Sequence, residues 1–108
     1  MMKVSSILSI VLFIVAVSMT TVSARDWKFG DGGLVRWDFN CDFNGHDIKC
    51  MPSRGEQCGG VCIANRACTH FTYNDGTCCI KKNHRGFVEM HSSGAVCGFI
   101  PGRSAQNL

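Results

Sequence analysis

Eight cysteines constrain the fold of this chain more than any other feature of its 108 residues. All of them lie between Cys41 and Cys97, and an even number in a short secreted chain predicts a disulfide framework, here of four bonds. A chain this short buries a small apolar core, so bridges worth about 2 to 4 kcal/mol each would supply much of its stability. The cysteines include no C-x2-C pair, and this spacing does not favour zinc, so we expect no metal site and no cofactor.

The first 24 residues are typical of a secretory signal peptide. Lys3 provides a positive start, residues 7–17 form an apolar run, and residues 22–24 (VSA) end in the small residue that signal peptidase requires. The apolar run is shorter than the roughly 20 residues needed to span a membrane. We therefore expect a secreted, extracellular protein with no membrane span, and a single mature domain over residues 25–108.

The charge balance argues against one class of partner. The chain contains 11 Lys or Arg against eight Asp or Glu, and with Lys3 in the leader the remainder is close to neutral. A nucleic-acid-binding domain would gather many cations on one face, so we expect no nucleic-acid partner. The densest basic stretch, formed by Lys81, Lys82 and Arg85, is a candidate ligand contact, although most such runs are solvated surface.

One helix is predicted. It starts at Ser53, where Glu56 three residues later would complete a capping box, and it ends at Asn65, which suits a left-handed closing position. Two central glycines weaken the helix by roughly 1 kcal/mol each relative to alanine, which favours a helix held against another backbone or by covalent bonds. Cys58 and Cys62 are one turn apart, so they lie on the same face of the helix. Disulfides from both would hold this face toward the interior of the protein.

The rest of the mature chain predicts short strands. Residues 66–73 are rich in Thr and aromatic side chains, residues 74–76 (NDG) are a hairpin turn signal, and residues 77–82 return as the second strand. We also expect an edge strand near residues 34–37, an extended piece up to Pro52, a polar loop over residues 83–94 and a last strand over residues 95–100. This order predicts an α+β fold in which one α-helix packs against a small antiparallel β-sheet.

The segment from residue 55 to residue 82, GEQCGGVCIANRACTHFTYNDGTCCIKK, resembles the core of the PAN/Apple domain family. The shared pattern is a helix with two cysteines one turn apart, a short loop, the strand CTHFTY, a turn, and a cysteine on the returning strand. Looser similarity extends this core over residues 37–100. The resemblance implies the family's disulfide-rich fold with the bonds Cys41–Cys97, Cys58–Cys78 and Cys62–Cys68. Cys79 departs from the pattern, since relatives often carry a large aromatic residue there.

The adjacent cysteines Cys78 and Cys79 raise the question of which face each one serves. Successive side chains of a strand point to opposite sides of a sheet, so one of the two should hold the helix and the other should find a partner elsewhere. Cys50 can be that partner if its segment lies over the far face of the sheet. We favour a Cys50–Cys79 bond, with exchanged roles for Cys78 and Cys79 as the alternative.

No catalytic constellation is visible in the sequence. All eight cysteines are committed to bonds, which leaves no thiolate nucleophile, and the four histidines occur in no metal-binding motif. His70 lies within the predicted hairpin and is expected to be packed or hydrogen-bonded there. We therefore expect no catalytic residues and a protein that is not an enzyme.

PAN/Apple domains are interaction modules that contact proteins or carbohydrates, so the resemblance implies a secreted binding module whose partner is an extracellular glycan or protein. Trp27 and Phe29 precede the first cysteine and lie outside the disulfide-bonded core. They are candidate ligand contacts, because aromatic rings stack on sugars and anchor interfaces, and the alternative that we favour slightly is packing onto the edge of the sheet. Trp37, Phe71 and Tyr73 are expected to be core residues, because alternation places them on buried faces.

The alternative is a cysteine-stabilised antimicrobial or toxin-like peptide of the defensin type. Such peptides also carry C-x3-C on a helix and G-x-C on a strand, as Cys58 with Cys62 and Gly76 with Cys78 do here. Their paired strand cysteines, however, are C-x-C rather than adjacent, and a membrane-disrupting peptide usually needs a basic amphipathic surface. The nearly neutral mature chain therefore favours the binding module.

Overall fold

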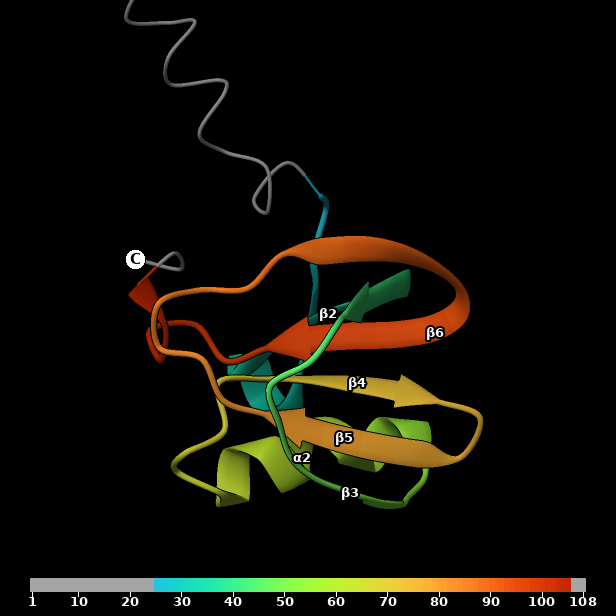
Figure 1. Cartoon of the computed structure of the whole chain (residues 1–108), viewed down its shortest axis with the longest axis horizontal. Helices are drawn as coiled ribbons and strands as arrows, with labels where there is room; N and C mark the ends of the chain where they lie inside the picture. Colours follow the sequence, from blue (N-terminus) through green and yellow to red (C-terminus); the bar gives the residue numbers. More distant parts are fainter. Residues whose placement is uncertain (1–24, 106–108) are drawn as a thin grey trace, which may run out of the picture.

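The computed structural model describes residues 25–105, so the predicted signal peptide over residues 1–24 lies outside the described residues. The described part holds six strands, one α-helix and one short 3-10 helix (Figure 1). In chain order these elements are β1 (Lys28–Gly30), η2 (Asp31–Gly33), β2 (Val35–Phe43), β3 (Asp47–Pro52), α2 (Gly55–Ala64), β4 (His70–Asn74), β5 (Thr77–Lys81) and β6 (Glu89–Phe99).

All six strands form one antiparallel sheet in the order β1-β2-β6-β4-β5-β3. The helix α2 packs against β4 and β5 on one face of this sheet, and Figure 1 shows it behind these strands. The predicted α+β fold, with one helix on a small antiparallel sheet, is therefore confirmed. The strand expected at an edge near residues 34–37 lies instead inside the sheet, because the unpredicted strand β1 covers its outer side.

The predicted hairpin is also confirmed. Strands β4 and β5 pair directly, from His70 opposite Lys81 to Asn74 opposite Thr77. The turn residues Asp75 and Gly76 have φ values of 48° and 79°, which is the conformation of a two-residue hairpin turn.

The last strand is longer than its sequence pattern indicated. Strand β6 begins at Glu89, so part of the predicted polar loop over residues 83–94 belongs to the sheet. Its pairing with β2 shifts register around Asn40, where the Gly94 N–H donates a hydrogen bond to Asn40 Oδ1 at 3.0 Å. Asn40 and Gly94 both have positive φ, 58° and 82°, which glycine adopts readily and asparagine tolerates. This bulge interrupts the alternation of side chains and explains why the pattern resembled a loop.

The ends of α2 differ from the predicted capping box. The helix begins at Gly55 after the cap residue Arg54, and no side chain caps its first turn. Ser53 Oγ donates instead to the Arg54 carbonyl oxygen at 2.8 Å, because Ser53 lies one residue too early to reach the helix. Asn65 is extended, with φ of −101°, rather than left-handed, and its side-chain oxygen accepts a hydrogen bond from the Ala67 N–H. The helix therefore depends on its disulfides and its packing more than on caps.

Four disulfides join all eight cysteines in the pairs Cys41–Cys97, Cys50–Cys79, Cys58–Cys78 and Cys62–Cys68, which are the pairs expected above. The Cys58–Cys78 bond fastens α2 to β5, and the Cys62–Cys68 bond joins the helix to the segment before β4. The Cys50 segment does not lie over the far face of the sheet. It is the edge strand β3, and Cys50 sits directly opposite Cys79 on the neighbouring strand β5.

The sheet carries an apolar cluster on each face. On the helix side, Phe71 and Ile80 pack with the bonded cysteines of α2. On the other face, an aromatic cluster surrounds the Cys41–Cys97 bond and consists of Phe43, Phe87 and Phe99, with Trp27 packed against it. Adjacent residues divide between the faces, since Phe71 belongs to the first cluster while His70 stacks on an aromatic ring of the second. The expectation that His70 is a packed residue is confirmed.

Gly98 in β6 leaves room for the Phe71 ring opposite it. An added Cβ would contact that ring and lie 2.7 Å from the carbonyl oxygen of Arg36, a backbone atom of β2 that cannot move aside alone. We expect Gly98→Ala to lower the free energy of unfolding by about 2 kcal/mol, as overpacked cores do. Chemical denaturation measures this loss. Gly60→Ala is the control, because its Cβ would meet only the Asp31 carboxylate at 3.9 Å, and equal losses in both variants would contradict the steric explanation.

Candidate ligand-binding groove

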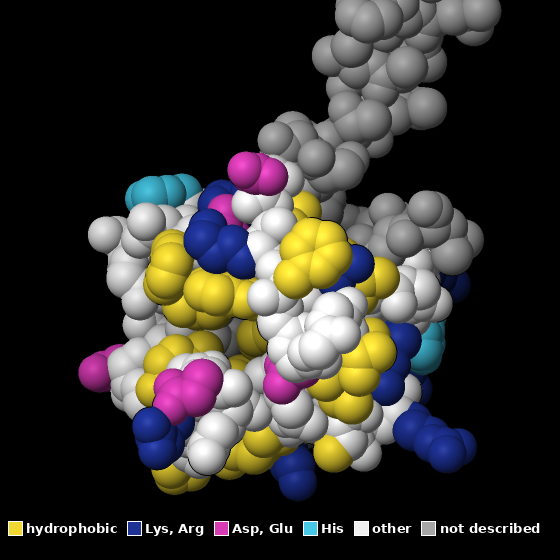
Figure 2. All heavy atoms as spheres, turned by 180° about the vertical axis from the view of Figure 1, so that it is seen from behind, with side chains coloured by type: hydrophobic (Ala, Val, Ile, Leu, Met, Phe, Trp, Pro, Cys, Tyr) yellow, Lys and Arg dark blue, Asp and Glu magenta, His cyan; other side chains and the backbone are white. Residues whose placement is uncertain are grey.

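A groove of about 450 Å³ opens between α2 and the strands β2, β4 and β6. Figure 2 views the molecule from the side opposite to Figure 1, where hydrophobic side chains surround a hollow and acidic side chains lie beside it. The volume falls within the roughly 300 to 1,000 Å³ that is typical of ligand pockets. The groove is therefore large enough to take a small ligand or a side chain of a partner.

Aromatic side chains form the walls of the groove. Trp37 and Phe39 of β2 meet edge to face with their ring centroids 5.0 Å apart, and Phe71 and Tyr73 of β4 complete the aromatic lining. Phe39 is 51% exposed, whereas Trp37 and Tyr73 are half-buried. The expectation of a core position is therefore confirmed for Phe71. Trp37 and Tyr73 pack against the core on one side and line the groove on the other.

Two glycines of α2 shape the groove. A Cβ atom at Gly55 would lie 3.2 Å from the Tyr73 ring, and one at Gly59 would lie 2.6 Å from Asp31 Oδ2, closer than real Cβ contacts allow. A side chain at Gly55 would press on the Tyr73 ring, and one at Gly59 would require the Asp31 carboxylate to move. Gly55 and Gly59 are four residues apart on one helix face, and this spacing was the sequence signal that could have indicated a close neighbour.

Two carboxylates stand at the groove, those of Asp31 and Glu56. Asp31 has a positive φ of 50° at the start of η2, and its carboxylate makes no hydrogen bond or ion pair with another residue in the part of the chain that the structure describes. Glu56 pairs with Arg54 at 2.6 Å, but both side chains are exposed, and such pairs contribute little to stability. The described lining contains no Lys or Arg, so the groove is negatively charged.

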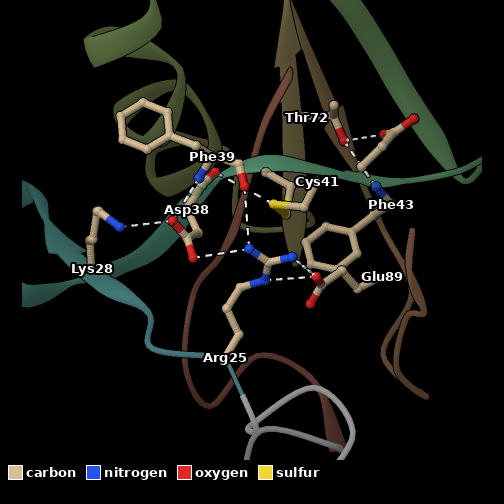
Figure 3. Close-up of a disulfide and its surroundings, with 10 residues drawn as sticks. Arg25, Lys28, Asp38, Phe39, Cys41, Phe43, Thr72 and Glu89 are labelled. Carbon is tan, nitrogen blue, oxygen red and sulfur yellow. Dashed lines mark hydrogen bonds and ion pairs between the residues drawn. A yellow bond between two sulfur atoms is a disulfide. The ribbon is translucent and has the colours of Figure 1, made fainter. Parts of the chain in front are cut away.

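A mostly buried carboxylate, that of Asp38, anchors the start of the described chain, as Figure 3 shows. Asp38 accepts hydrogen bonds from Lys28 Nζ at 2.8 Å and from Arg25 Nη1 at 3.0 Å. Arg25 also pairs with Glu89. Burial alone would raise the pKa of Asp38, but Lys28, the Phe39 N–H and Arg25 together lower this pKa to about 2. The Lys28 ammonium is thereby held 5.4 Å from the centroid of the Phe39 ring.

The two aromatic residues that the sequence singled out lie outside the groove lining. Trp27 is half-buried, and its ring meets that of Phe99 edge-on with the centroids 5.0 Å apart. Phe29 is 69% exposed, and the centroid of its ring lies 3.8 Å from the guanidinium carbon of Arg36. Trp27 therefore belongs to the second apolar cluster, and Phe29 is a surface ring on the edge strand β1.

The basic residues that the sequence singled out do not form one surface. Lys81 is buried, and its ammonium donates hydrogen bonds to Asp47 Oδ1 at 2.6 Å and to the Gly45 carbonyl oxygen at 3.1 Å. Lys82 and Arg85 are exposed, and none of the three lines the groove. A strand places neighbouring residues on opposite faces, so a run of charges in the sequence need not be a patch in the fold.

Three side chains with potential metal ligands meet at the β3 edge of the sheet. The carboxylate of Asp47 and the sulfur atoms of Cys50 and Cys79 lie within 4.8 Å of one another. The two sulfur atoms are bonded to each other, so neither can serve as a thiolate ligand. This cluster is therefore a disulfide with an acidic neighbour.

No helix within residues 25–105 combines the length and the apolar character needed to cross a membrane. No protein-family model matches the chain, and a search of curated proteins found no relative. The similarity to the PAN/Apple family therefore stays a prediction from the sequence.

Proposed function

We propose that the protein is a secreted, non-catalytic binding module that holds an extracellular glycan or protein ligand in the aromatic groove. The observation that carries this proposal is a groove of about 450 Å³ whose aromatic walls stay partly open, with Phe39 51% exposed. Ligand sites are typically concave and mostly apolar, with a few polar groups that orient the ligand. Asp31 and Glu56 supply such polar groups here.

Covalent bonds support the proposal because they hold the groove walls in place. The Cys58–Cys78 bond ties α2 to β5, and the Cys41–Cys97 bond ties β2 to β6 two residues beyond Phe39. A preorganised site loses less conformational entropy when its ligand binds, so rigid walls favour affinity. Four disulfides are also typical of extracellular proteins, which supports the predicted secretion.

A panel of immobilised glycans and secreted proteins tests this proposal with two matched variants. Phe39→Ala removes an exposed ring from the groove wall, whereas Phe29→Ala removes an exposed ring outside it. We expect Phe39→Ala to weaken binding by about tenfold or more, since an aromatic anchor contributes at least about 1.4 kcal/mol. Phe29→Ala should leave binding unchanged. The proposal fails if the unmodified protein binds nothing on the panel, or if only Phe29→Ala weakens binding.

A further inference from the structure

We infer that the groove binds a Lys or Arg side chain on the surface of a protein partner; this inference rests on the proposed function and specifies its ligand. The groove combines carboxylates with aromatic rings, and this combination suits a cation carried on an apolar stem. Its charge, its rings and its shortage of hydrogen-bond donors all favour such a ligand over a glycan.

Asp31 provides one of the two negative charges of the groove lining. Its carboxylate lies against α2, where a Cβ at Gly60 would be 3.9 Å from Oδ1, and it has no ion-pair partner within residues 25–105. Glu56 adds a second carboxylate, which is shared with the exposed Arg54. The described lining itself carries two carboxylates and no Lys or Arg. The nearby cations Arg54 and Lys28 stand outside the lining, and each is paired with a carboxylate, that of Glu56 or of Asp38. Charge complementarity of this kind selects a basic ligand over an acidic one.

The rings of the groove wall already attract a cation of the chain itself. Lys28 Nζ lies 5.8 Å from the centroid of the Trp37 ring and 5.4 Å from that of the Phe39 ring. Asp38 accepts a hydrogen bond from this ammonium at 2.8 Å, and Lys28 does not line the groove. A partner's cation within roughly 6 Å of a ring centroid would be attracted by the same negative ring faces. The same rings can therefore contribute to binding a cation from the groove side.

A neutral sugar matches the groove less well. Sugar hydroxyls both donate and accept hydrogen bonds, so a sugar site needs donors as well as acceptors. Among the described lining side chains, the only donors are the indole N–H of Trp37 and the hydroxyl of Tyr73. A Lys or Arg side chain needs acceptors alone, and Asp31 and Glu56 provide them. We therefore expect a basic segment of a protein rather than a glycan.

Three blocked peptides test the class of ligand. They share the sequence Gly-Ser-Leu-X-Leu-Ser-Gly, where X is Arg, Gln or Glu, and binding is followed by NMR at the Trp37 indole N–H and the Gly59 amide of the disulfide-bonded protein. We expect the Arg peptide to shift both signals and to bind about tenfold more tightly than the Gln peptide, with the Glu peptide weakest. High salt should weaken the Arg peptide most, because it screens the attraction between exposed charges.

Two charge-neutralising variants test the role of the groove carboxylate. Asp31→Asn removes a charge at the groove, and Asp26→Asn removes an exposed charge outside the lining. We expect Asp31→Asn to weaken the Arg peptide by about tenfold and to leave the Gln peptide unchanged. Asp26→Asn should affect neither peptide, which separates a local contact from a general loss of negative charge.

Equal affinities for the Arg and Gln peptides, or equal effects of the two variants, would overturn the inference. Cellohexaose serves as a neutral sugar probe. If it shifts the Trp37 signal while the Arg peptide does not, the ligand class is wrong but the groove remains a binding site. If no probe shifts Trp37 and Phe39→Ala has no effect on the panel, the proposed function falls together with this inference.

Discussion

A variant with Cys41 and Cys97 both replaced by alanine is expected to lose about 4 kcal/mol of unfolding free energy, whereas the matching Cys62 and Cys68 variant should lose about 2 kcal/mol. The two bonds differ in the length of chain that they close, with sequence separations of 56 and 6 residues. A cross-link that closes a longer loop removes more entropy from the unfolded chain. All four cysteines are fully buried, so burial does not account for the difference.

Unfolding in guanidinium chloride at constant pH measures both variants against the unmodified protein. A third variant that replaces Cys58 and Cys78 gives an intermediate point, because their separation of 20 residues corresponds to a loss of about 3 kcal/mol. The three losses should rise with loop length. Equal losses in all three variants, or the largest loss for the shortest loop, would contradict an entropic role for these bonds.

Local signals in the sequence were sufficient to predict much of the fold. Asp75 and Gly76 adopt the positive φ values that the NDG turn requires, and this placed the hairpin. The spacing of Cys58 and Cys62 by one helical turn predicted the fastened face of the helix. Each of these features depends on residues that are close in sequence, so the local sequence pattern is enough to predict it.

Features that depend on distant partners were not predictable in the same way. The bulge in β6 is held by Gly94 and Asn40, which are 54 residues apart, and the interrupted alternation hid the strand. The short strand β1 exists because it pairs with β2 and because Asp38 holds the Lys28 ammonium. A hydrophobic pattern contains no signal for either contact.

The groove escaped prediction because its residues resemble ordinary structural residues in the sequence. Trp37 and Tyr73 alternate like core residues, and they do pack on the core with one side. The central glycines of α2 predicted a close neighbour for the helix, but the sequence did not indicate that the neighbour of Gly59 is the Asp31 carboxylate. Lys81 shows the opposite case. The sequence indicated an exposed basic residue that could contact a ligand, whereas the structure buries its side chain in an ion pair with Asp47. Whether a side chain is open to a ligand depends on packing between elements far apart in the chain.

Protonation of His70 is opposed by its surroundings. The ring is fully buried, stacks on Phe87 with the centroids 4.3 Å apart, and meets the Phe43 ring edge-on at 5.3 Å. Nδ1 lies 2.7 Å from Thr69 Oγ1, and Nε2 has no hydrogen-bond partner among the described residues. The pKa of His70 is lowered from 6.5 to about 3, mainly by burial and in smaller part by the nearby Lys81 ammonium. The folded protein therefore keeps this imidazole neutral.

Acidification should destabilise the fold through His70. In the unfolded chain this residue takes up a proton as the pH falls below 6.5, whereas in the folded protein its pKa is about 3. Between these two values the unfolded state binds more protons, so the free energy of unfolding falls as the pH falls. The loss that His70 causes should reach about 2 kcal/mol by about pH 5 and about 4 kcal/mol near pH 3, where the folded state also begins to take up the proton.

His70→Phe separates this effect from other titrating groups, because an aromatic ring in that place can keep the stack on Phe87 without a titrating nitrogen. Urea unfolding at about pH 7 and about pH 5 should show a drop of about 2 kcal/mol for the unmodified protein and a much smaller drop for the variant. Asp38, whose pKa is lowered to about 2, loses its stabilising charge only in more acidic solution. An equal drop in both proteins would mean that folded His70 accepts a proton readily, and burial would then not control its titration.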